Sequence, residues 1–205
     1  MRFMTTSCTR VFFTLMLSLG LTTVALAQQS SPTATVKTTV DTILSILRKP
    51  DFNFDTDRVA IKTEVTKAFD ATAMAQSVLS TNWRNATKEQ QEEFRDLLLD
   101  TIENSYIDRL KEYTNESVDF RGESVNGDRA TVESIVMLQS GGVPVNYKLR
   151  QRQNLWYVYD VEVENVSMVS SYRDTYRDIV RRSGMDGLLA QMRTKLEELK
   201  AGRGV

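Results

Sequence analysis

The period of the hydrophobic pattern changes near Asn115, and this change constrains the fold more than any other feature of the chain. Before Asn115, apolar residues recur every three to four positions, which is typical of helices. From Val118 to Val163 they alternate with polar residues, which is typical of strands with one buried face. Helical spacing then returns and continues to Leu199. Helices followed by strands and again by helices predict an α+β fold, with helices packed on an antiparallel sheet.

Four helices are predicted before the change of period. The first ends before Pro50 and has one apolar face, formed by Val36, Val40, Ile43, Leu44 and Leu47. The next two cover about residues 56–68 and 71–83, and the longest covers about 88–113. Thr87 and Gln90 form the pattern of a capping box, in which each side chain accepts a hydrogen bond from the other residue's backbone N–H. This pattern places the start of the longest helix near residue 88.

Four strands are predicted after the change of period. The first contains Val118 and Phe120, and the next three cover about residues 131–138, 143–149 and 155–163. Short turns join them, so we expect a four-stranded antiparallel meander that twists, with the N-terminal and C-terminal helices packed on it. In the last strand the alternation predicts that Trp156 and Val158 face one side of the sheet, and that Leu155, Tyr157, Tyr159, Val161 and Val163 face the other. Two helices follow, separated at Gly184.

The first 27 residues have the three parts of a secretory signal peptide. Arg2 and Arg10 are the only charged residues before Lys37, an apolar stretch follows Arg10, and Ala25-Leu26-Ala27 closes the stretch. We therefore expect cleavage after Ala27, and a single exported domain over residues 28–205. A membrane anchor is the alternative, but a spanning helix needs about 20 predominantly apolar residues, and this stretch is shorter. Cys8 lies ahead of the stretch, too early for a lipid-modified cysteine at the cleavage site.

The composition argues against most classes of enzyme and against metal sites. The chain contains no histidine, so it lacks the usual general base and the commonest ligand of zinc and copper. Its single cysteine lies in the predicted leader, so we expect no disulfide. The 27 acidic residues leave catalysis by two carboxylates open, but most of them alternate with Lys and Arg on helix faces. There is no Gly-rich phosphate loop and no basic stripe, which argues against nucleotides and nucleic acid as partners.

The most specific pattern in the chain begins in the last predicted strand. Residues 156–173 read WYVYDVEVENVSMVSSYR and resemble the signature W-x-V-Y-D-V-x-x-x-G-V-S-x-V-x-x-Y-R of the MlaC family, also called the toluene-tolerance auxiliary family. Further similarities lie at Phe69-Asp70, Met74-Ala75, Trp83 and residues 184–189, so the resemblance covers nearly all of residues 35–200. Asn165 stands where the family has glycine. Because asparagine tolerates left-handed backbone, we expect the turn to be kept.

This resemblance implies a periplasmic phospholipid carrier of the Mla lipid transport pathway, which maintains the lipid asymmetry of the outer membrane. The implied partners are phospholipid, an outer-membrane lipoprotein–porin complex and an inner-membrane ABC transporter. The implied fold is a twisted sheet with helices that enclose the acyl chains. The carrier is expected to be a monomer that needs no cofactor beyond its lipid cargo and catalyses no reaction.

A carrier must replace the bilayer around the acyl chains, because exposing each CH₂ group to water costs about 0.8 kcal/mol of free energy. The candidate lipid-binding residues are the apolar and aromatic side chains of the sheet, the long helix and the last helices: Phe94, Leu98, Tyr106, Met137, Val145, Tyr147, Leu149, Trp156, Val158 and Tyr172. Each of them could equally fill an ordinary core, and the pattern does not tell which face of the sheet the lipid lines. Arg150 and Arg173 are candidates for a phosphate contact near the mouth of the pocket, with ordinary surface arginines as the alternative.

Other functions remain open from the sequence. Ser167 and Ser170 could be nucleophiles of a secreted lipid hydrolase, but no histidine would activate them and no G-x-S-x-G turn is present. A non-catalytic adaptor between envelope complexes and a carrier of another lipid, such as a hopanoid, are the remaining alternatives.

Overall fold

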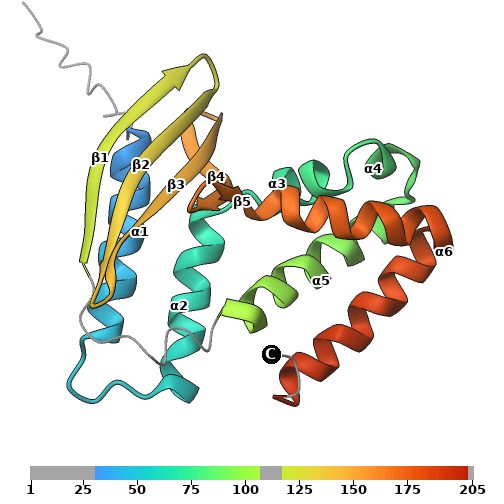
Figure 1. Cartoon of the computed structure of the whole chain (residues 1–205), viewed down its shortest axis with the longest axis horizontal. Coiled ribbons are helices and arrows are strands. Elements are labelled where there is room, and N and C mark those ends of the chain that lie inside the picture. The colour runs from blue at the N-terminus through green and yellow to red at the C-terminus, as the bar shows by residue number, and fades with distance from the viewer. Residues whose placement is uncertain (1–30, 107–116, 203–205) are drawn as a thin grey trace, which may run out of the picture.

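The computed structural model describes residues 31–106 and 117–202 and has the predicted α+β architecture (Figure 1). The helices are α1 (Pro32–Leu47), α2 (Phe54–Ala68), α3 (Ala71–Leu79), α4 (Thr81–Asn85), α5 (Lys88–Tyr106) and α6 (Met168–Lys200). The strands are β1 (Ser117–Asn126), β2 (Arg129–Leu138), β3 (Gly141–Arg152), β4 (Leu155–Val163) and β5 (Val166–Ser167). They form one antiparallel sheet in the order β1-β2-β3-β4-β5. The predicted meander is confirmed, but it has five strands rather than four.

The helix boundaries follow the local signals in the sequence with one exception. The capping box is present, because Thr87 N–H donates to Gln90 Oε1 over 3.0 Å and Gln90 N–H donates to Thr87 Oγ1 over 3.2 Å. The helix predicted over residues 71–83 is instead split into α3 and α4, because Ser80 between them has a φ of 53°. In α6 the expected break occurs at Gly184, whose φ of 67° and ψ of −175° are accessible almost only to glycine. Residues 107–113 of the long predicted helix lie outside the described residues.

A β-bulge in β4 corrects the predicted faces of that strand. Leu149 pairs with Val158, but the preceding residue Lys148 pairs with Asp160, so Tyr159 is the extra residue of β4. One extra residue reverses the alternation beyond it. Val161 therefore packs against the same cluster as Val158, and not on the opposite face with Tyr157 as the simple alternation predicted.

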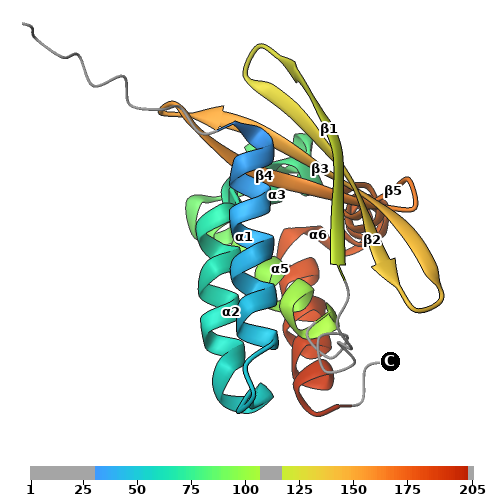
Figure 2. The ribbon, with the colours of Figure 1, turned by 90° about the vertical axis from the view of Figure 1, so that its left-hand side faces the viewer.

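The described chain consists of two lobes with separate cores, which lie side by side in Figure 1 and one behind the other in Figure 2. The sheet lobe comprises the sheet with α1 and α2, and the helix lobe comprises α3, α4, α5 and α6. The buried residues of the sheet core are Val36, Ala130, Val132, Leu149, Trp156 and Val158. Those of the helix core are Met74, Ala75, Val78, Leu79, Phe94, Leu98, Val169, Tyr176, Leu188, Leu189 and Met192. A third, smaller core of Ile46, Leu47 and Ile61 joins α1 to α2.

Asp70 joins the two lobes. Its carboxylate is buried and caps α3 by accepting a hydrogen bond from Ala73 N–H over 2.9 Å. The other carboxylate oxygen lies 2.8 Å from both Nε and Nη2 of Arg150 and 3.4 Å from Nη1 of Arg152. Its backbone N–H donates to the carbonyl of Val158 over 2.8 Å. One residue thus fixes the start of the helix lobe to β3 and β4.

Asp160 makes the second connection between the lobes. Its buried carboxylate accepts hydrogen bonds from the Ser167 hydroxyl over 2.6 Å and from Val169 N–H over 3.0 Å. Ser167 in turn accepts a hydrogen bond from Ser170 N–H over 3.0 Å and so caps α6. β4 is therefore fixed to the first turn of α6.

Asn165 in the turn before β5 has a φ of 67°, which confirms that it keeps the left-handed conformation expected at this position.

Candidate functional site

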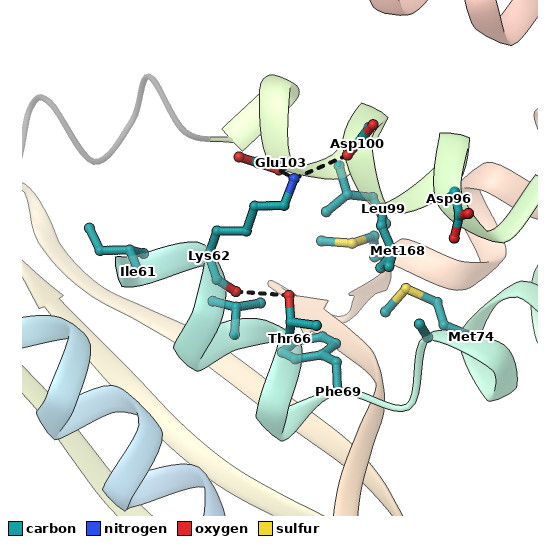
Figure 3. A pocket seen from close by; sticks show the side chains of 13 residues that line it. Ile61, Lys62, Thr66, Phe69, Met74, Asp96, Leu99, Asp100, Glu103 and Met168 are labelled. Atoms are coloured by element: carbon teal, nitrogen blue, oxygen red, sulfur yellow. Dashed lines mark hydrogen bonds and ion pairs between the residues drawn. The ribbon is translucent and has the colours of Figure 1, made fainter. Parts of the chain in front are cut away.

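An apolar cavity of about 420 Å³ lies where the two lobes meet (Figure 3). Its walls come from α2 of the sheet lobe, from α3 and α5 of the helix lobe, and from Met168 at the start of α6. The apolar lining residues are Ile61, Val65, Phe69, Ala71, Met74, Leu99, Ile102 and Met168. This volume is within the range of about 300–1,000 Å³ that is common for small-molecule sites.

The α2 wall of the cavity is a stripe at helical spacing. Ile61, Val65 and Phe69 are each four positions apart, so their side chains lie above one another on one face of the segment. Thr66 also lines the cavity, but its hydroxyl donates to the Lys62 carbonyl over 2.8 Å, as the dashed line in Figure 3 shows. This leaves its methyl group as the part that can contact an apolar ligand.

Charged side chains gather at one rim of the cavity. Lys62 of α2 reaches across to α5, where its ammonium lies 3.2 Å from Asp100 Oδ1 and also pairs with Glu103 (Figure 3). The hydrogen bond to Glu103 is the main cause that raises the pKa of Lys62, and partial burial opposes it. Asp96 lines the cavity as well and pairs with Arg95, its neighbour in sequence, over 2.8 Å. An apolar interior with a charged rim is suited to an amphiphile.

The predicted lipid-binding residues lie elsewhere in the molecule. Leu149, Trp156 and Val158 are buried in the sheet core, and Tyr147 packs against it. Phe94 and Leu98 are buried in the helix core, and Tyr172 packs against that core. The structure therefore divides these seven candidates between the two cores. None of the candidates whose side chains are described lines the 420 Å³ cavity.

The three remaining candidates are placed as follows. Val145 is buried in the sheet, and Met137 is 44% exposed near the end of β2. The side chain of Tyr106 lies outside the described part of the structure. Tyr172 also lines a second, smaller cavity of about 230 Å³ between β4, β5 and α6. Met168 lines both cavities and lies between them.

The residues of the signature motif mainly hold the lobes together. Trp156 and Val158 fill the sheet core, and Asp160 binds the cap of α6. Arg173 donates from Nε to the Ser77 carbonyl over 2.8 Å and so ties α6 to α3. Arg150, which lies outside the motif, donates from Nε to the carboxylate of Asp70. Both arginines that the sequence suggested as phosphate contacts therefore have structural partners.

Ser167, one of the two candidate nucleophiles, has a structural role in the described part of the chain. Ser167 caps α6, and its hydroxyl donates to Asp160. Burial raises the pKa of the Tyr147 hydroxyl, so this group stays neutral at physiological pH. Within residues 31–106 and 117–202, no group of His, Cys, Asp and Glu is arranged to hold a metal ion. In the same ranges, no helix is long and apolar enough to cross a membrane.

Comparisons with known proteins agree on one family. A family model described as MlaC protein matches residues 37–194. The chain is 23% identical over 189 residues to the intermembrane phospholipid transport system binding protein MlaC of Haemophilus influenzae, and the match covers 87% of this chain and 88% of that one. It is 29% identical over 120 residues to the toluene tolerance protein ttg2D of Pseudomonas putida, a match that spans 56% of that protein.

A solved structure has the same fold. It is that of a phospholipid-binding protein from Ralstonia solanacearum in complex with a phospholipid. The two structures superpose with a TM-score of 0.75 at 24% sequence identity, over 82% of this chain and 97% of the other. At this identity the similarity establishes the arrangement of helices and strands.

Proposed function

This chain belongs to the MlaC protein family, and we propose that it is a periplasmic carrier that holds the acyl chains of a phospholipid in the cavity between its two lobes. The observation that carries this proposal is the apolar lining of the 420 Å³ cavity, beside which Lys62, Asp100 and Glu103 form one charged cluster. Acyl chains placed there would be kept from water, while the head group would stay at the rim. The relatives' printed names and the phospholipid bound to the Ralstonia solanacearum protein support the same cargo.

The carrier role further implies an exchange between two membranes. We infer that the protein receives or delivers lipid at an outer-membrane lipoprotein–porin complex and at an inner-membrane ABC transporter, as its family suggests. The protein itself supplies storage and no chemistry, so the energy for net transport comes from the transporter. The sequence of residues 1–27, with its A-x-A end, supports export and cleavage after Ala27.

We expect the protein recovered from the periplasmic fraction to begin at Gln28 and to contain diacyl phospholipid. Its intact mass and the lipids extracted from it, both measured by mass spectrometry, test these two expectations. Protein that retains its first 27 residues in the membrane fraction would contradict the localisation. Correctly processed protein that is free of lipid, and that also takes up none from vesicles, would instead favour the adaptor function. Extraction of a hopanoid in place of phospholipid would favour the carrier of another lipid.

A further inference from the structure

The rim of the cavity has charges that can recognise a lipid head group, at residues other than the two arginines that the sequence suggested. Lys62 is the only cation among the described residues that line the cavity. Its ammonium is held by ion pairs to Asp100 and Glu103, on the opposite wall (Figure 3). A phosphate at the end of an acyl chain buried in the cavity would therefore have Lys62 as the one cationic partner among these residues.

We propose that this rim makes the carrier prefer phospholipids whose head group carries an ammonium, of the phosphatidylethanolamine type, over anionic phospholipids. The inference rests on the proposed function, because it concerns the head group of a lipid whose acyl chains fill the cavity. It adds a selectivity that an apolar cavity alone would not have.

The local charge balance at the rim favours a head group that carries its own positive charge. Asp100 and Glu103 bring two negative charges to the single positive charge of Lys62, so the cluster has a negative excess. The charge of Asp96 is offset by Arg95. A phosphate that binds Lys62 increases the negative excess, unless the same head group brings a positive charge of its own. The ammonium of a zwitterionic lipid supplies that charge and can donate hydrogen bonds to the carboxylate that Lys62 releases.

The rim is open enough to rearrange in this way. The side chains of Lys62 and Asp100 are 47% and 40% exposed, and that of Glu103 is 20% exposed. Ion pairs this close to water contribute little to stability, so exchanging one partner for a lipid group is not costly. The same exposure limits the selectivity, and we expect a preference of about fivefold, which is the effect of one unit charge in a partly screened site.

The test measures competition between two lipids. Lipid-free mature protein is incubated with vesicles that contain equal amounts of phosphatidylethanolamine and phosphatidylglycerol with identical acyl chains, and the lipid bound to the re-isolated protein is counted by mass spectrometry. For the natural chain we expect about five molecules of phosphatidylethanolamine for each phosphatidylglycerol at low salt, and a smaller ratio at high salt. The double variant Asp100→Asn with Glu103→Gln should lose this preference, because Lys62 is then free to bind an anionic head group.

Lys67→Gln is the matched control for a change of charge. Lys67 lies on the same helix, pairs with Glu64 and does not line the cavity, so its loss should leave the ratio unchanged. Equal uptake of both lipids by the natural chain, or an unchanged ratio in the double variant, would overturn the head-group inference and leave the carrier function standing. Uptake of neither lipid would overturn the carrier function itself.

Discussion

The Leu99→Glu variant is expected to fold normally and to lose its phospholipid. Leu99 lines the cavity from α5, is partly exposed, and belongs to none of the buried core clusters of the described chain. In the empty cavity, water can reach a carboxylate at this position. An acyl chain would strip that water away at a cost of several kcal/mol, so we expect the affinity for lipid to fall by about 100-fold or more.

Leu98→Glu is the control, because it places the same charge one residue earlier on the same helix. Leu98 has no exposed surface and lies in the helix core beside Phe94. An unpaired carboxylate there costs several kcal/mol, which is comparable with the whole stability of a domain. Circular dichroism melts and lipid extraction of both variants decide the matter. If Leu99→Glu keeps its lipid, or unfolds as Leu98→Glu does, the cavity is not the lipid site.

Replacing Asp70 by alanine is expected to cost about 3 kcal/mol of unfolding free energy, because the variant leaves a partly buried arginine without its partner. The Asp70 side chain is 3% exposed and that of Arg150 is 25% exposed. The variant also loses the N-cap of α3, a loss that typically costs about 1 kcal/mol on its own. Urea denaturation of the natural and variant proteins measures the difference.

Asp174→Ala is the matched comparison for this loss of a carboxylate. Asp174 pairs with Arg177 one turn along α6, and both side chains are more than 60% exposed. Removing such a pair should change the stability by less than about 1 kcal/mol. If the two variants are equally stable, Asp70 does not hold the lobes together as inferred from its hydrogen bonds.

Local signals in the sequence were sufficient to predict most of the fold. The change of period near Asn115 separated the helices from the sheet, and the capping box at Thr87 marked the start of α5. The bulge at Tyr159 was not predictable, because an extra residue in one strand is defined by its pairing with another strand. The two-residue strand β5 was missed for a related reason, since it is too short to show an alternation.

The cavity could not be predicted from periodicity, which identifies a buried face but not what that face contacts. The predicted residues Phe94 and Val158 are indeed buried, but they pack in closed cores. The cavity forms where α2 meets α5 and Met168, which are distant in sequence. One signal was available, namely the stripe Ile61, Val65 and Phe69, which begins on α2 and ends one residue beyond it. Lys62 gave no signal, because a lysine next to such a stripe usually belongs to a solvated helix face.

The most direct test of the lipid site is photocrosslinking with a phospholipid that carries a photoreactive group in the middle of one acyl chain. The loaded protein is irradiated and digested, and the labelled residues are identified by mass spectrometry. We expect labels on the cavity walls, at positions such as Val65, Met74 and Leu99. Labels confined to β3 and β4, at Val145, Tyr147, Leu149, Trp156 or Val158, would contradict this site and would place the lipid against the sheet.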